Sequence, residues 1–317
     1  MGERCWVFDG QSAKRVSRDE AAAAVGKTHL VWVHLPGSHT DTAGWLEAQG
    51  LSEIVVSALT ATETRPRTEA FDDGALINLR GPLVQEANHP DLLGSVRLWV
   101  SNKHVFSVAL TDLEAIHDVE RQLSEGKVLD AGDLVCVMAT AITAELDPDV
   151  AELGDHLDDC EETLDPHRAF AMRSEIARIR SRAIVYRRFL QPQRIALEDL
   201  AKIDGDWLAA DDRRHLGEAA DRAARMAEEL EAIRERSALM HEQLTDLRAE
   251  LIDTRSLILA IAAMIFLPLT FITGLFGMNV DGIPYQHHPA SFWVITGFCL
   301  LVAVGVTAYF MWRRWSR

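Results

Sequence analysis

The chain has 317 residues, enough for two domains, and its composition of 48% hydrophobic and 25% charged residues is that of an ordinary globular protein. Its formal net charge of −16 argues against nucleic-acid binding, because contacts to phosphates need concentrated lysine and arginine. The excess of acid favours cationic partners, although it would also serve solubility alone.

Residues 1–130 predict a cytosolic α/β domain. Short strand-like runs at residues 30–35, 75–79, 96–100 and 104–110 alternate with helical stretches, and these strands look local. The amino terminus lacks the basic and apolar regions of a signal peptide, so we expect this part of the chain to stay in the cytosol. The four cysteines lie far apart and form no C-x-x-C pair, which indicates a reducing compartment.

Motifs for nucleotide binding and for hydrolysis are incomplete or missing in the sequence. Residues 26–28 read GKT, like the end of a phosphate-binding loop, but Ala21 stands where that loop needs its first glycine. Neither HExxH nor GxSxG occurs. We therefore expect no enzymatic activity, no cofactor and no nucleotide partner.

Residues 131–256 predict a helical domain that contains a strongly acidic segment. Between residues 147 and 165 there are nine carboxylates and no basic residue. His156, Asp159 and Cys160 share one face of the predicted helix and are candidate zinc ligands. The alternative is an acidic helix that concentrates or senses cations.

From about residue 216 the sequence predicts a stalk: one continuous helix of about 60 residues, about 90 Å long, that runs into an apolar segment. A first stripe along it repeats with alternating steps of three and four, which predicts lengthwise packing against other helices. The first stripe consists of Ala223, Met226, Leu230, Ile233, Ser237, Met240, Leu244, Leu247, Leu251, Thr254 and Ile258.

A second stripe lies on roughly the opposite side of this helix. It is acidic in the soluble part and small or hydroxylated in the apolar part, which predicts close helix packing or a pore. Like carboxylates on parallel copies would repel unless water or cations lay between them, so the acidic half favours a pore over close helix packing. The alternative is a solvated face, which also predicts exposed carboxylates. The second stripe consists of Glu235, Leu239, Glu242, Asp246, Ala249, Asp253, Ser256, Ala260, Ala263, Leu267, Thr270 and Gly274.

Two transmembrane helices are predicted near the carboxy terminus, at residues 257–277 and 292–312. Each is uncharged over roughly 20 residues, enough to cross about 30 Å of hydrocarbon. The loop between them, residues 278–291, holds glycine and proline and makes the pair an antiparallel hairpin. Pro268 deletes one backbone hydrogen bond in the first span, a vacancy that a neighbouring helix, a water-lined surface or a hydroxyl such as that of Thr270 could fill.

Arginines flank the hairpin on one side only, including the basic tail at residues 313–317, and the only formal charge in the loop is Asp281. The positive-inside rule therefore predicts both termini in the cytosol and the loop outside. Tryptophans near the ends of the second span fit as interfacial anchors. The arginines are Arg248, Arg255, Arg313, Arg314 and Arg317, and the tryptophans are Trp293, Trp312 and Trp315.

The first span ends in PLTFITGLFGMN, and here the chain closely resembles the CorA family of metal-ion transporters, whose signature Gly-Met-Asn is Gly277, Met278 and Asn279 in this sequence. WVHLPG at residues 32–37 and ETRPRTEAFDDGALINLRG at residues 63–81 extend the resemblance over nearly the whole chain. The loop sequence NVDGIPY looks more like the ZntB branch, which handles zinc and is thought to couple its uptake to protons, than like the family's magnesium transporters.

The resemblance implies a homopentameric funnel in the bacterial inner membrane, with the first span lining the pore and the second span outside it. Asn279 would form a ring of amide oxygens at the outer mouth, suited to a hydrated dication. Leu259 and Leu267 would be apolar constrictions. The implied ion pathway comprises Glu235, Glu242, Asp246, Asp253, Ser256, Leu259, Ala263, Leu267, Thr270, Gly274, Gly277, Met278 and Asn279.

Three functions remain open on this evidence. The leading hypothesis is zinc transport, with Asp281, His287 and His288 of the loop as further candidate ligands, and the alternative for the two histidines is a solvated loop without a metal. A magnesium, cobalt or nickel channel of the same build is the second hypothesis. The third is a membrane-anchored scaffold or metal sensor whose hairpin only tethers it.

Overall fold

The computed structural model describes residues 2–38, 41–62, 65–84, 93–163, 169–278, 283 and 288–315. These residues fall into two compact units. The first takes in the described residues up to His241, except Ala169, and the second begins at Glu242. Helix α7, Ala210–Phe276, belongs to both, so the chain passes from one unit to the other within a single helix.

The first unit is built on a sheet that has seven strands in the described residues. They are β1 (Arg4–Phe8), β2 (Ala13–Arg15), β3 (Leu30–Pro36), β4 (Arg67–Phe71), β5 (Gly74–Pro82), β6 (Leu93–Val100) and β7 (His104–Ala109). Their order is β2-β1-β3-β7-β6-β5-β4. β3 and β7 pair in parallel, while the other neighbouring strands are antiparallel. A parallel pair needs a long connection, and here it contains β4, β5 and β6.

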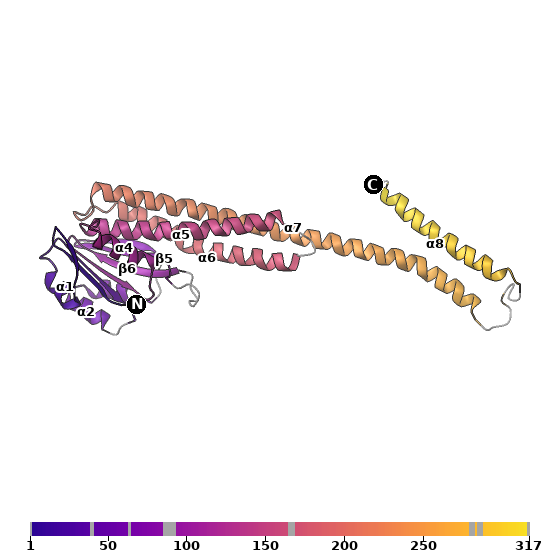
Figure 1. Cartoon of the computed structure of the whole chain (residues 1–317), viewed down its shortest axis with the longest axis horizontal. Coiled ribbons are helices and arrows are strands. Elements are labelled where there is room, and N and C mark those ends of the chain that lie inside the picture. Colours follow the sequence, from indigo (N-terminus) through magenta and orange to yellow (C-terminus); the bar gives the residue numbers. More distant parts are fainter. Residues whose placement is uncertain are drawn as a thin grey trace. The chain divides into compact units, whose positions relative to one another are not determined.

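Helices cover both faces of the sheet (Figure 1). On one face Val33 and Phe106 pack in a core with residues of the three short helices α1, α2 and α3. On the other face a Cβ added to Gly81 would lie 3.0 Å from Ile142 of α5, so strand and helix are in close contact there. The helices of this unit besides α7 are α1 (Arg18–Ala24), α2 (Thr42–Ala48), α3 (Glu53–Thr60), α4 (Glu114–Ser124), α5 (Ala131–Glu162) and α6 (Ala169–Ala201).

The predicted α/β fold of this part of the chain is confirmed, and the four predicted strands correspond to β3, β5, β6 and β7. The sequence missed β1, β2 and β4. The strand β4 lies at an edge of the sheet and is largely exposed, so its residues carry no apolar alternation. The expectation of purely local pairing was wrong, because Val33 of β3 lies opposite Phe106 of β7.

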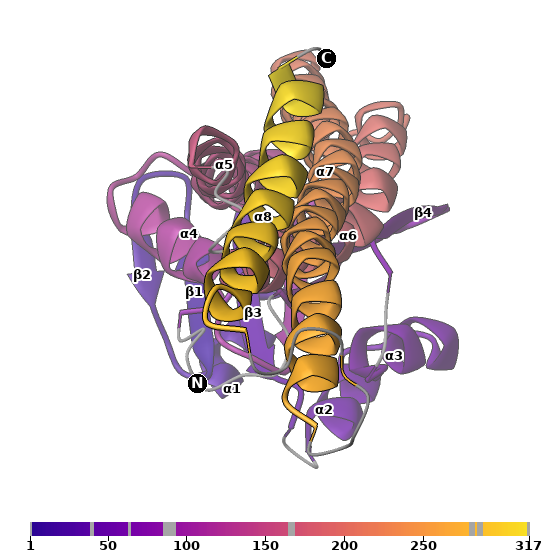
Figure 2. The same cartoon turned by 90° about the vertical axis from the view of Figure 1, so that its right-hand side faces the viewer.

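The long helices α5, α6 and the first part of α7 run side by side (Figure 1 and Figure 2). The hydroxyl of Tyr186 on α6 donates a hydrogen bond of 3.0 Å to Asp149 of α5. An ion pair of 2.9 Å joins Arg187 of α6 to Glu231 of α7. These contacts tie the three helices together within the first unit.

Glu145 of α5 supplies a cap to another helix, α4. The residue that precedes α4, Leu113, offers no side-chain cap, and the Glu145 carboxylate accepts a hydrogen bond from the backbone N–H of Ala115 instead. Its Oε2 is buried without a hydrogen-bond partner. Burial, and then the nearby Asp118 and Glu114, raise the pKa of Glu145 to about 7.

We predict that this raised pKa makes the first unit less stable as the pH rises. The folded protein holds the Glu145 proton more tightly than the unfolded chain, so stability falls between about pH 4.5 and about pH 7. Glu145→Gln keeps an acceptor for Ala115 without the charge, and should stabilise the unit at pH 8 by about 1–2 kcal/mol. Thermal unfolding of the full-length protein in detergent at pH 5 and pH 8 measures this, and Glu162→Gln on the exposed end of α5 is the control. Equal pH dependence in both variants would contradict the prediction.

Candidate functional site

The two predicted stripes of α7 differ sharply in burial. From Ala223 to Leu244 the first stripe is buried, and each of its residues there is at most 3% exposed. Ser237, the polar member, satisfies its hydroxyl by donating 2.7 Å to the carbonyl of Ile233 in the same helix. Beyond Leu244 the first stripe emerges, and Ile258 is 61% exposed, so lengthwise packing within one chain ends earlier than the sequence predicted.

Every residue of the second stripe is exposed in the single chain. Leu239 in the first unit is 59% exposed, and the two predicted constrictions, Leu259 and Leu267, are 71% and 70% exposed. Exposed leucine side chains are unfavourable in water, so this surface is suited to contact lipid or other copies of the chain, or to line a narrow conduit.

The acidic half of the second stripe keeps most of its charge unpaired. Glu235 is approached at 4.0 Å by Arg234, whose closer partner is Glu231 at 2.5 Å. Among the described residues no ion pair involves Glu242, Asp246 or Asp253. These carboxylates can therefore attract mobile cations.

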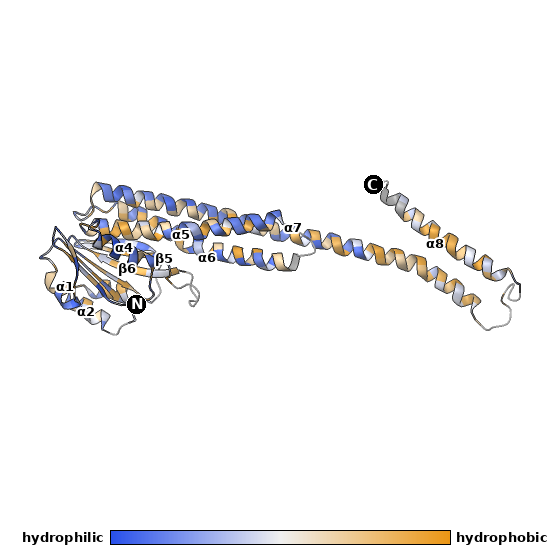
Figure 3. Cartoon of the chain, in the orientation of Figure 1, coloured by the Kyte–Doolittle hydropathy of each residue, from blue (hydrophilic) through white to orange (hydrophobic). Residues whose placement is uncertain are grey.

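The apolar half of α7 and the helix α8 (Ser291–Trp315) are each long and apolar enough to cross a membrane, and the most apolar stretch of each is unburied. Figure 3 shows both segments mainly in orange and white, in contrast to the mixed blue and orange of the first part of α7. Trp293 and Trp312 are 72% and 74% exposed, as interfacial anchors would be. The Trp315 side chain lies outside the described residues.

Thr270 does not fill the vacancy that Pro268 creates. A proline at this position leaves the carbonyl of Met264 without its helical donor, but the Thr270 hydroxyl donates 2.7 Å to the carbonyl of Phe266. That bond is the usual one for threonine in a helix, since the carbonyl four residues back lies within reach of the hydroxyl. The Thr270 oxygen keeps its lone pairs, so it can accept from a hydrated ion.

The signature Gly-Met-Asn begins where α7 ends. The helix stops at Phe276, and the N–H of Gly277 donates 2.9 Å to the carbonyl of Thr273. Met278 is 49% exposed. Asn279, Asp281 and His287 lie outside the described residues. His288 is described, and its Nδ1 accepts 3.2 Å from the N–H of Ala290 just before α8.

The candidate zinc ligands of α5 are not brought together as a metal site. His156 faces Glu152 at 3.8 Å, and Cys160 is half-buried with a pKa raised mainly by that burial. In the described part of the chain no group of three His, Cys, Asp or Glu side chains could hold a metal ion. Helical spacing alone aligned His156, Asp159 and Cys160 in the sequence, and in the described residues the fold does not gather them into a set of metal ligands.

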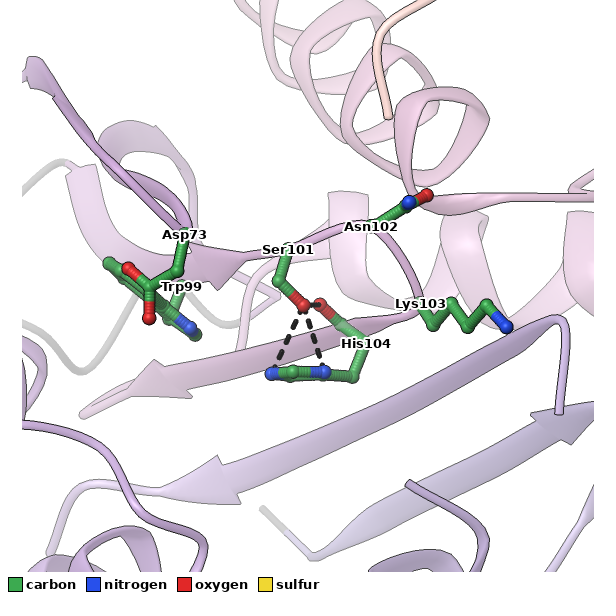
Figure 4. Close-up of a pocket in the computed structure, with 6 residues that line it drawn as sticks. All are labelled: Asp73, Trp99, Ser101, Asn102, Lys103 and His104. Atoms are coloured by element: carbon green, nitrogen blue, oxygen red, sulfur yellow. Dashed lines mark hydrogen bonds between the residues drawn. The ribbon is translucent and has the colours of Figure 1, made fainter. Parts of the chain in front are cut away.

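One open polar pocket went unnoticed in the sequence (Figure 4). It lies at the turn between β6 and β7, where the Ser101 hydroxyl is 2.8 Å from Nδ1 of His104. Burial lowers the pKa of His104, and the nearby Asp73 opposes this effect. No spacing in the sequence could have signalled this pocket, because Asp73 comes from a different turn. Its lining residues are Asp73, Trp99, Ser101, Asn102, Lys103 and His104.

Comparison with known proteins decides the family. A family model described as CorA-like Mg2+ transporter protein matches residues 27–314. The chain belongs to the CorA family. Among curated relatives, the zinc transport protein ZntB of Cronobacter sakazakii is 32% identical over 312 residues, which cover 98% of this chain and 94% of the relative.

Two solved structures of full-length proteins share the fold. The full-length CmaX protein is 29% identical, with a TM-score of 0.78 over 98% of this chain and 96% of that one. The CorA magnesium transporter from Methanocaldococcus jannaschii has a TM-score of 0.80 over 98% of both chains. At 18% identity the latter likeness concerns the fold alone. The CorA fold therefore accounts for both units and for the long helix that joins them.

We predict that the two stripes of this CorA-family stalk respond oppositely to truncation. Leu230→Ala removes a fully buried side chain and should cost about 2–5 kcal/mol of stability of the first unit. Leu239→Ala, nine residues further along the same helix, removes a side chain that is 59% exposed and should cost less than about 1 kcal/mol. Denaturant unfolding of the full-length protein, followed by hydrogen exchange in α7, measures both. Similar losses in the two variants would mean that Leu239 is packed.

Proposed function

We propose that this CorA-family protein carries zinc through a conduit lined by the second stripe of α7. The observation that supports this most is the division of α7, with the first stripe buried from Ala223 to Leu244 and the second stripe bare along its whole length. A solvated surface helix would explain bare carboxylates in the soluble part. It would not explain why the same side continues into small and hydroxylated residues between bulky apolar ones.

A homopentamer would turn each residue of the stripe into a ring of five. Rings of Glu235, Glu242, Asp246 and Asp253 would attract dications at the cytosolic end. Within the membrane, small or hydroxylated rings of Ser256, Ala263, Thr270 and Gly274 would alternate with apolar rings of Leu259 and Leu267. Thr270 suits such a role because its hydroxyl proton is engaged with Phe266 and its oxygen faces outward as an acceptor.

Gly277, Met278 and Asn279 would form the outer mouth, with the five Asn279 amide oxygens accepting hydrogen bonds from the water shell of a dication. Asp281, His287 and His288 would gather and partly dehydrate zinc in the loop, since imidazole suits this borderline-soft ion. The arginine bias supports an inner-membrane hairpin with both termini in the cytosol. The cargo zinc is the substrate, and the proposal requires no resident cofactor or nucleotide.

The identity of the ion rests on relatives. The curated relative from Cronobacter sakazakii is named for zinc transport, whereas the family model is described by magnesium. A magnesium, cobalt or nickel channel of the same build is therefore the second candidate. A tethered sensor or scaffold would need neither a pore nor the Asn279 ring.

We expect purified protein in proteoliposomes to take up zinc in preference to magnesium. Uptake would be followed with fluorescent indicators for each ion, inside vesicles that hold a proton gradient of either sign. Faster zinc uptake with the gradient directed inward would support proton coupling. Magnesium flux without zinc flux would establish the second candidate, and absence of both would leave only the tethered protein.

We further expect Asn279→Ala to change the ratio of zinc to magnesium uptake by about two- to tenfold, the equivalent of one lost hydrogen bond to the hydrated ion. The matched control is Asn102→Ala, an exposed asparagine at the turn between β6 and β7. This control should retain the wild-type ratio. An unchanged ratio in Asn279→Ala would remove Asn279 from the selectivity of the pathway.

A further inference from the structure

Two arginines flank the acidic stripe at its cytosolic end, and the closest carboxylate partners of each lie outside that stripe. Arg234 and Arg236 are the sequence neighbours of Glu235, so they project about 100° to either side of it on the helix. Arg234 lies 2.5 Å from Glu231, which also pairs with Arg187 of α6. Both flanks of the stripe thus carry a cation that could weaken its negative field.

On the other flank Arg236 forms ion pairs with the acidic end of α5. Its Nη2 lies 2.6 Å from Asp158 and 2.5 Å from Glu161, one turn further along α5. Hydrogen bonds to Glu161 and then to Asp158 raise the pKa of the Arg236 guanidinium. Two carboxylates on one guanidinium leave this cluster with a net charge of about −1.

Stability is a weak explanation for this cluster. All three side chains are about half exposed, at 43% for Arg236, 58% for Asp158 and 53% for Glu161. Ion pairs this exposed contribute roughly 0–1 kcal/mol each to folding. The charges of these side chains set the local electrostatic potential whether or not the ion pairs stabilise the fold.

We propose that Asp158 and Glu161 are positioning residues for the conduit, which neutralise Arg236 and hold its guanidinium against α5, outside the acidic stripe. Without them each protomer would bring one free cation next to Glu235 and Leu239, at the place where dications gather. The inference rests on the transport function proposed above, and it assigns to the acidic end of α5 a task other than binding metal. It also explains why carboxylates are concentrated there although the described residues of α5 assemble no metal site.

The test compares initial zinc uptake by full-length protein in proteoliposomes, at zinc well below saturation and at low ionic strength. The double variant Asp158→Asn/Glu161→Gln changes each cluster from about −1 to about +1, and its uptake should fall about three- to tenfold. The fall should shrink in 0.5 M salt, where the Debye length is only about 3–5 Å. Adding Arg236→Gln to the double variant removes the freed cation and should restore uptake to within about twofold of wild type.

A matched control separates this effect from a general loss of acid. Asp155→Asn/Glu162→Gln removes two exposed carboxylates of the same helix, neither of which takes part in the Arg236 pairs. Its uptake should stay within about twofold of wild type. An equal fall in this control, or failure of Arg236→Gln to restore uptake, would overturn the inference.

Structure and function are checked in parallel. The molecular mass of the assembly and the midpoint of thermal unfolding should be unchanged in all variants, and a shift in the double variant that Arg236→Gln does not reverse would assign the cluster a structural role instead. Absence of zinc flux in the wild type would overturn the transport proposal and this inference with it. Flux in the wild type with no fall in the double variant would overturn this inference alone.

Discussion

The division of α7 into a buried side and a bare side is the constraint on which the other features depend. Apolar residues from Ala223 to Leu244 bury one side of the helix, and this burial fixes the rotation of the helix about its own axis. The opposite side must then face outward, whatever its composition. The direction in which Glu235 and Leu239 point is thus decided by packing of residues such as Leu230, on the far side of the helix.

Charge is distributed around that helix in a way that burial alone does not explain. The acids of the bare side are left with few partners, while Arg234 and Arg236 find partners on neighbouring turns or on α5. A surface designed only for solubility would mix both signs along one face. Here neighbouring carboxylates neutralise the two arginines beside Glu235, so the negative potential at this end of the stripe is available to cations from solution.

The apolar half of α7 continues the same helix, but in a segment where an unpaired backbone group is far more costly than in water. In hydrocarbon every backbone carbonyl needs a donor, and Pro268 removes the one that Met264 would have used. Thr270 and Thr273 instead direct their hydroxyls to the carbonyls of Phe266 and Leu269 in their own helix. The Thr270 oxygen, on the second stripe, thereby remains as an acceptor on the side where a conduit would run, without a free donor that would repel a cation.

The sequence by itself determined the features that repeat along one element. The spacing of apolar residues predicted the long helix and its buried side, the two uncharged segments predicted the hairpin, and the Gly277-Met278-Asn279 signature with its surroundings pointed to the CorA family. Local pattern sufficed there, because burial in a helix follows a fixed period and a membrane span needs a fixed apolar length.

Only the tertiary structure decided which residues from distant segments meet. Three contacts join residues that are separated by many positions, so no sequence period connects them. They are the pairing of β3 with β7, the cap that Glu145 gives to α4, and the ion pairs of Asp158 and Glu161 with Arg236. The same limit applies to the candidate zinc ligands of α5: His156, Asp159 and Cys160 share a helix face, but within the described part of the chain the fold assembles no group of three such ligands. Spacing reports neighbours within one element, whereas contacts between elements depend on how complete helices and strands pack.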